Sequence, residues 1–195
     1  DNISVVDPLY TLPFLICLIL ASRRQRGSKW RLRWNYLGIA ISSAYMIFTF
    51  YNKYRVNEIF EQSLQREGIA YHRMTVSPSI FNNILWQGLA EGDTAYYHGM
   101  YSLLDREPRV LEFSTIPKGH ELLKPYENDR VAGILKWFSN GYYTVLTLPD
   151  GTLQFNDLRF GALGETFKSE KDFVFRFLLK DENGALKAQQ NREQP

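Results

Sequence analysis

The sequence has almost no cysteine, since Cys17 is the only one among 195 residues. A single thiol excludes a disulfide-stabilised scaffold and a zinc site built from cysteines. A strong net charge is also absent: the formal value is +2, which argues against a protein built mainly around a nucleic-acid backbone. Charged residues at 23% and hydrophobic residues at 45% exclude a disordered tail or a collagen-like repeat. The length fits one domain, or a small domain with appendages.

The sequence also lacks the motifs of common enzyme sites. It contains no HExxH pair, nucleophile elbow, P-loop or dinucleotide fingerprint. His72, His98 and His120 have no carboxylate or second histidine at ligand spacing, so each is interpreted as a surface or turn residue. The residues alone therefore provide no complete active site.

The small net charge conceals two unlike parts. Residues 1–54 carry a net charge of +5, and residues 55–195 carry a net charge of −3. Six of the seven cations of the first part lie between Arg23 and Arg33, and no acidic residue interrupts that run. The anionic head groups of a lipid bilayer are the expected partner of this basic loop, and no nucleic acid is expected as a partner.

Two apolar stretches flank the basic loop: residues 5–22, with the single charge of Asp7, and residues 34–50, with none. A hydrocarbon core needs about 20 apolar residues, and aromatic residues lie near the ends of the stretches, as at a membrane interface. This pattern predicts two transmembrane helices in residues 1–54. Two buried helices of a soluble domain are the alternative. A signal peptide does not fit, because the cations follow the first apolar stretch.

The positive-inside rule places the basic loop in the cytoplasm. The part after Tyr54 then lies on the periplasmic or extracellular side of a bacterial inner membrane that the protein crosses more than once. The chain begins at Asp1 without an initiator methionine. We therefore expect a fragment of a longer protein, whose upstream helices contact the two predicted here.

The remainder of the chain predicts a second kind of structure. Residues 55–68 extend the second helix to Gly68. Residues 69–182 are expected to form a soluble α+β domain, and residues 183–195 a flexible tail. Short β-rich segments between turn residues predict strands, and one helical spacing predicts a helix at 127–139. The predicted strands are 70–76, 84–90, 95–104, 110–116, 142–148, 153–159 and 173–179. The predicted fold class is α+β, an N-terminal transmembrane helical hairpin followed by a mainly antiparallel β domain with one packed helix.

Two acidic positions are candidates for function. Asp7 precedes Pro8, a pair typical of a helix start, and it is either a helix cap or a functional carboxylate in the apolar stretch. Asp157 and Arg159 lie two residues apart on a predicted strand, so their side chains share one face. A structural cross-strand ion pair is the favoured interpretation of these two residues, and a functional pair is the alternative.

Several motifs carry a family resemblance that extends over the chain as far as about Leu179. The motifs are VDPLYTLP at 6–13, Asn82-Asn83 with Leu85-Trp86, and the patterns at 97–102, 137–143 and 157–161. With these motifs the chain resembles the YdjM-like family of LexA-binding, inner-membrane-associated, metal-dependent hydrolases.

The resemblance implies a membrane-bound enzyme that hydrolyses an ester or phosphoester with a divalent metal, zinc or a similar ion. The metal motifs of the family lie in further upstream helices, so only Asp7 is carried over as a catalytic or metal-binding candidate. Asp157 and Arg159 are further catalytic candidates, and Asn83, Trp86 and Arg159 are candidate substrate contacts of an outer domain that shapes access. The alternative function is a non-catalytic membrane-anchored binding or structural domain. The family's name also suggests a tether for a DNA-damage regulator, which conflicts with an outward-facing domain.

Overall fold

The structure is a computed structural model that describes residues 1–4, 6–162, 172–182 and 185–190. The chain divides into two compact units. The first unit comprises residues 1–68, 76–88 and 100–111. The second unit comprises residues 69–75, 89–99 and 112–195.

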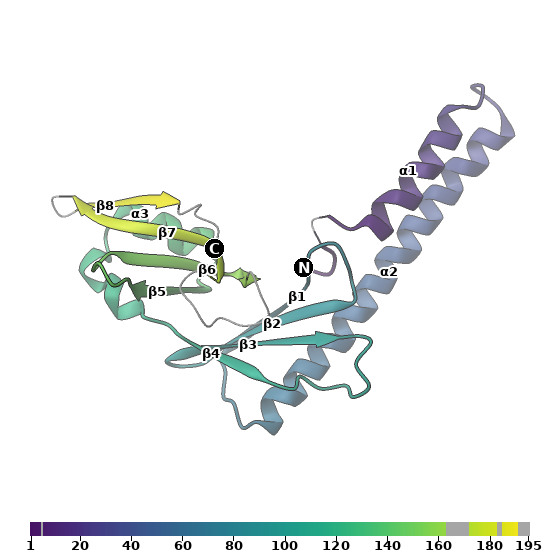
Figure 1. Cartoon of the computed structure of the whole chain (residues 1–195). Helices are drawn as coiled ribbons and strands as arrows, with labels where there is room; N and C mark the ends of the chain where they lie inside the picture. The colour runs from purple at the N-terminus through teal and green to yellow at the C-terminus, as the bar shows by residue number, and fades with distance from the viewer. Residues whose placement is uncertain (5, 163–171, 183–184, 191–195) are drawn as a thin grey trace. The chain divides into compact units, whose positions relative to one another are not determined.

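The first unit begins with two helices that lie side by side as a hairpin (Figure 1), α1 at Pro8–Ser22 and α2 at Lys29–Arg66. Capping side chains fix where both helices begin. The Asp7 carboxylate accepts backbone N–H groups of the first turn of α1, and the Ser28 hydroxyl accepts the N–H of Trp30 at the start of α2. Such caps satisfy N–H groups that the helix itself cannot pair.

The two helices of the hairpin contact each other through small residues. Gly38 of α2 lies against Cys17 of α1, and a Cβ at Gly38 would lie 3.0 Å from the Cys17 Cβ. Ala21, one turn further along α1, is also buried. The large apolar residues of α1, among them Leu12 and Ile16, are exposed instead. The contact between the helices therefore covers only a narrow stripe of each.

The C-terminal part of α2 belongs to the core of the first unit. Val56, Phe60 and Leu64 repeat at helical spacing and are buried. Gly88 makes room for the Phe60 ring, because a Cβ there would lie 2.2 Å from it. Trp86 is also fully buried. Helix α2 is therefore one continuous helix whose N-terminal part belongs to the hairpin and whose C-terminal part belongs to a packed core.

The strands form two four-stranded antiparallel sheets (Figure 1), one in the order β1-β2-β3-β4 and one in the order β5-β6-β7-β8. The strand bounds are β1 Arg73–Pro78, β2 Leu85–Glu91, β3 Ala95–Ser102, β4 Phe113–Pro117, β5 Tyr143–Thr147, β6 Leu153–Ala162, β7 Phe173–Glu182 and β8 Ala185–Gln190. Between β4 and β5 lie a 3-10 helix, η1 at His120–Tyr126, and α3 at Arg130–Phe138. One core of the second unit is formed by residues of η1, α3 and the second sheet, including Leu123, Leu135 and Phe155.

The prediction of a transmembrane helical hairpin is wrong. No helix in the described part of the chain is both long enough and apolar enough to cross a membrane. Helix α1 has 15 residues, about 22 Å at 1.5 Å per residue, which is less than a hydrocarbon core of about 30 Å. Helix α2 is longer, but Asn35, Ser42 and Ser43 lower the hydropathy of its apolar stretch.

Two elements of the structure differ from the predicted β domain. The strands divide into two sheets rather than one, and β8 was not predicted because its sequence, ALKAQQ, is poor in β-forming residues. Strand β8 forms by antiparallel pairing with β7, and the Asp129 carboxylate also accepts the Leu186 N–H at 3.0 Å. Strand β8 lies within the expected flexible tail, whose residues 183–184 and 191–195 lie outside the described residues.

Candidate functional site

Asp7 is buried, and both of its carboxylate oxygens accept hydrogen bonds. Oδ1 accepts the N–H groups of Leu9 at 3.0 Å and Tyr10 at 3.3 Å, and Oδ2 accepts the Tyr45 hydroxyl at 2.8 Å. Burial and the hydrogen bond to Asp7 raise the pKa of Tyr45. The carboxylate therefore caps α1 and also ties α1 to α2.

The role of Asp7 in a metal site stays a prediction. Within the described ranges, no three His, Cys, Asp or Glu side chains lie together in a way that could hold one metal ion. Both oxygens of Asp7 accept hydrogen bonds from the hairpin itself. The structure thus gives Asp7 a structural role as a helix cap and as a link between α1 and α2.

Asn83 and Trp86, the predicted substrate contacts, are both buried in the first unit. Asn83 accepts the Asn52 amide at 2.8 Å and donates to the backbone carbonyl of Asn2 at 2.8 Å. The Trp86 indole N–H donates to the Asn83 carbonyl at 3.1 Å. The two predicted contacts form part of a buried hydrogen-bond network. Asn52, on α2, was missed from the sequence because nothing marks a polar residue there as buried.

Asp157 and Arg159, in the second unit, form a two-pronged ion pair. Asp157 Oδ1 accepts the Arg159 backbone N–H at 3.0 Å and Nε at 3.1 Å, and Oδ2 accepts an Arg159 terminal nitrogen at 2.8 Å. The Asp157 side chain is fully buried, whereas that of Arg159 is 30% exposed. The guanidinium also lies near the rings of Phe138 and Phe160, at 5.5 and 5.3 Å from their centroids. The pair has the geometry of a structural ion pair.

This ion pair runs along a single strand, not across two strands as expected. The residues opposite Asp157 are Tyr143 on β5 and Phe175 on β7. Neither of these residues is a cation. Asp157 therefore forms its ion pair with Arg159 of the same strand. A register shift that begins after Asp157 accompanies this local arrangement, as β-bulges re-aim side chains near them.

A cluster that the sequence did not indicate surrounds Glu91 in the second unit. Its carboxylate accepts the Lys118 ammonium at 2.7 Å and the Arg73 guanidinium. Although burial favours the neutral acid, hydrogen bonds from Lys118 and Arg73 lower the pKa of Glu91. The Arg73 guanidinium also lies 4.1 Å from the centroid of the Tyr142 ring. These residues are distant in sequence, so no local motif could reveal the cluster.

The histidines do not form a site, and one of them is not on the surface. His72 is exposed and pairs with Asp93 at 2.6 Å. His120 stacks on Tyr143 with ring centroids 4.0 Å apart. His98 lies buried within β3, and its burial lowers its pKa from 6.5 to about 4. The interpretation of His98 as a surface or turn residue is therefore wrong, because the strand directs its side chain inward.

We expect the free energy of unfolding to fall as the pH decreases from 6.5 toward 4. Unfolded His98 takes up a proton near its ordinary pKa of 6.5, whereas folded His98 does so only near 4, so the unfolded state binds more protons in this window. At pH values below the folded pKa, the total loss in the free energy of unfolding reaches about 3 kcal/mol. Urea denaturation at several pH values measures it.

The matched variant is His98→Gln, which should flatten the pH dependence in this range. The variant should not abolish the pH dependence, because burial also lowers the pKa of His120. The titration of His120 therefore changes the stability in the same direction. Parallel pH profiles for the wild type and His98→Gln would show that His98 does not titrate as the structure implies.

A strongly charged surface lies at the end of the hairpin, where α1 turns into α2. We call it the basic end and define it by its six cations: Arg23, Arg24, Arg26, Lys29, Arg31 and Arg33. All six are exposed, and no acidic residue occurs between positions 8 and 57. The basic end therefore carries a concentrated positive charge that the hairpin sequence does not neutralise.

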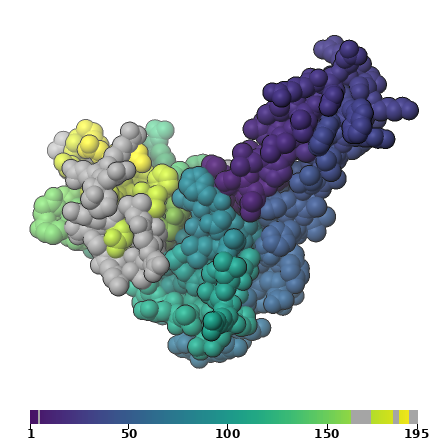
Figure 2. Space-filling view, turned by 45° about the vertical axis from the view of Figure 1, so that its right-hand side comes forward, coloured from purple at the N-terminus to yellow at the C-terminus, as the bar shows by residue number. Residues whose placement is uncertain are grey.

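Exposed apolar side chains extend from the basic end along both helices, as far as about 25 Å beyond Arg33 at Phe50. On α1 and α2, respectively, they include Leu12, Ile16 and Leu18, and Leu32, Ile39 and Phe50. Figure 2 shows the surface of the hairpin, in purple and blue, on the face in view. An apolar surface of this kind beside concentrated charge is characteristic of an interaction site.

No family model, curated protein or solved structure matches the chain. The resemblance to YdjM-like hydrolases consequently stays a prediction from the motifs. The feature that the geometry defines is a helical hairpin with a basic end and exposed apolar side chains.

Proposed function

We propose that this chain is a lipid-binding module whose hairpin attaches it to an anionic bilayer surface without crossing the bilayer. The observation that carries the proposal is the basic end, six cations with no acidic residue from position 8 to 57, continuous with exposed apolar side chains. A surface that combines cations with apolar residues matches the boundary between lipid head groups and acyl chains.

The apolar side chains supply one part of the binding free energy. Leu12 and Ile16 of α1 are each 55% exposed, and Ile47 of α2 is 70% exposed. Burying a large apolar side chain completely contributes about 1.5–3 kcal/mol. Even partial insertion of a few such residues therefore contributes several kcal/mol, which is the scale needed for reversible attachment to a bilayer.

The basic end supplies the other part. Each cation close to an anionic bilayer contributes about 1 kcal/mol, and the contribution decreases within a Debye length of about 8–10 Å at physiological salt. Arg33 also lies over the Trp30 ring, with its guanidinium 5.0 Å from the ring centroid. An amphipathic indole beside a cation suits the head-group region.

Hydrolysis at the membrane stays a prediction that rests on the family resemblance. Its site candidates in this chain have structural contacts: Asp7 caps α1, Asn83 and Trp86 lie in a buried network, and Asp157 pairs with Arg159. The inner-membrane location and the outward orientation likewise stay predictions. The binding proposal depends on none of them.

Flotation of the intact chain with lipid vesicles tests the proposal. We expect the chain to float with vesicles that contain phosphatidylglycerol, and to bind vesicles of phosphatidylcholine alone much more weakly. Added salt should weaken binding to the anionic vesicles without abolishing it, because apolar contacts are not screened. Equal recovery with both kinds of vesicle, or no recovery with either, would overturn it.

A further inference from the structure

The basic end contains a pocket of about 430 Å³ between the last turn of α1 and the first turns of α2. Its lining combines apolar side chains with cations and hydroxyls: Leu18, Ala21, Ser22, Gly27, Ser28, Lys29, Arg31, Leu32 and Asn35. Small-molecule sites are typically concave, mostly apolar and furnished with a few polar groups. This pocket has that composition, and its volume falls within their usual range of about 300–1,000 Å³.

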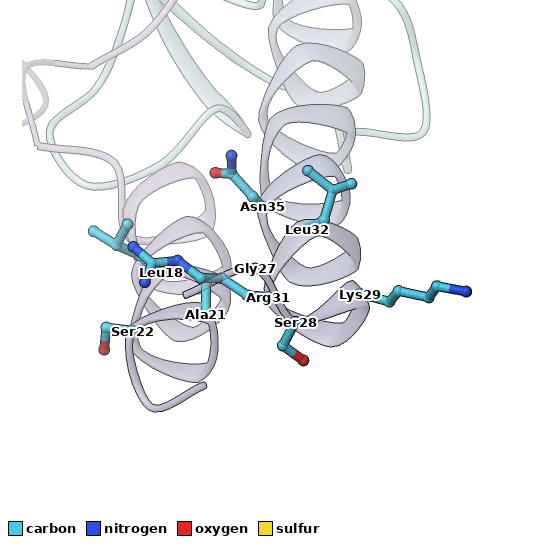
Figure 3. Close-up of a pocket in the computed structure, with 9 residues that line it drawn as sticks. All are labelled: Leu18, Ala21, Ser22, Gly27, Ser28, Lys29, Arg31, Leu32 and Asn35. Atoms are coloured by element: carbon cyan, nitrogen blue, oxygen red, sulfur yellow. The ribbon is translucent and has the colours of Figure 1, made fainter. Parts of the chain in front are cut away.

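The arrangement of the cations in the pocket is asymmetric. Figure 3 shows the Arg31 side chain reaching from α2 across toward α1, whereas Lys29 points away from α1. The Asn35 side chain also extends from α2 toward α1 (Figure 3). Arg31 and Asn35 thus present one guanidinium and one amide on the side of α2 that faces α1.

Within the described residues, no acidic side chain forms an ion pair with Arg31. No ion pair described by the structure involves Arg31 or Lys29, and the hairpin sequence has no acidic residue between positions 8 and 57. The pocket also adjoins the beginning of α2 at Lys29, where the helix dipole places partial positive charge. An anion in the pocket would therefore meet the Arg31 guanidinium and the partial positive charge of the helix start, and no acidic side chain of the hairpin.

We propose that this pocket binds the phosphate of an anionic phospholipid head group, with Arg31 as the principal phosphate ligand. The planar guanidinium pairs with phosphate oxygens through two parallel hydrogen bonds, which makes arginine well suited to this chemistry. Leu18 and Leu32 in the same lining provide apolar surface for the glycerol and the first acyl carbons. The inference rests on the proposed function and assigns one place where a head group is bound specifically.

The test compares Arg31→Gln with Arg24→Gln in the intact chain, using phosphatidylglycerol vesicles. Both variants remove one exposed cation of the basic end, but Arg24 does not line the pocket. We expect about fivefold weaker binding for Arg24→Gln, from the general surface charge. For Arg31→Gln we expect a loss at least about tenfold larger than that, because a charge-assisted contact is also lost. Arg31→Lys should fall between Arg31→Gln and the wild type.

A competition experiment separates the lipid head group from free phosphate. A soluble short-chain phosphatidylglycerol should displace the wild type from vesicles at lower concentration than inorganic phosphate does at the same ionic strength. If inorganic phosphate competes equally well, the pocket is not a lipid head-group site. If Arg31→Gln and Arg24→Gln lose the same affinity, or Arg31→Lys binds like the wild type, the pocket assignment fails while the lipid-binding function stands. If the wild type does not bind anionic vesicles, both proposals fail.

Discussion

Replacing Arg23, Arg24 and Arg26 together with glutamine is expected to weaken binding to anionic vesicles by roughly two orders of magnitude, since each cation near such a surface contributes about 1 kcal/mol. All three side chains are exposed, and they lie in the segment that joins α1 and α2. Glutamine retains the length and polarity of the side chain but removes the charge. Vesicle titration of the intact chain measures the affinity.

The control for this variant removes the same number of charges elsewhere. Arg106, Lys124 and Arg130 are exposed and lie outside the hairpin, so their replacement by glutamine changes the net charge of the chain equally. We expect the control to bind anionic vesicles within about twofold of the wild type, because only cations within a Debye length of the bilayer contribute strongly. A loss of similar size in both variants would mean that net charge, rather than the basic end, determines binding.

The starts and ends of the two hairpin helices could be predicted from local sequence patterns. Asp7 followed by Pro8 predicts a helix start, and the Asp7 carboxylate does cap α1. The unbroken helical spacing up to Gly68 predicts one long second helix, and α2 ends at Arg66. These features depend on neighbouring residues, which is why a single sequence is enough to predict them.

Contacts between residues that are far apart in the sequence could not be predicted. The contact of Asn52 with Asn83 joins α2 to the start of β2, 31 positions apart, and the Glu91 cluster joins β1, β2 and the segment after β4. Nothing in the local pattern marks any of these residues as buried or paired. The same limit applies to Asp157, whose choice of partner depends on the aromatic residues opposite it in the sheet.

The transmembrane prediction was wrong for a different reason. Apolar residues occur on nearly every side of α1, which is also the pattern of a membrane span, and the prediction gave this pattern more weight than the length of the helix. Length and hydropathy decided the question: no described helix has enough of both to cross a membrane. The exposed apolar residues and the basic end remain, and the lipid-binding proposal is the interpretation that uses both.

Replacing Arg159 with methionine is expected to lower the free energy of unfolding by about 3–5 kcal/mol, because it leaves a buried carboxylate without its cation. The Asp157 side chain has no exposed surface, and three of its hydrogen bonds come from Arg159, of which two are made by the guanidinium. Methionine also removes the contacts of the guanidinium with the Phe138 and Phe160 rings and its hydrogen bond to the Phe138 carbonyl. The loss therefore combines the uncompensated charge with these contacts, and urea denaturation measures it.

The double variant Asp157→Asn with Arg159→Met distinguishes charge from packing. Asparagine removes the buried charge with little change in size, so the double variant should recover at least about 1 kcal/mol relative to Arg159→Met alone. Arg130→Met, at an exposed position, should stay within about 0.5 kcal/mol of the wild type. A double variant as unstable as the sum of its two single variants would show that the ion pair contributes no coupling, and that Arg159 stabilises the second unit through its contacts with Phe138 and Phe160 instead.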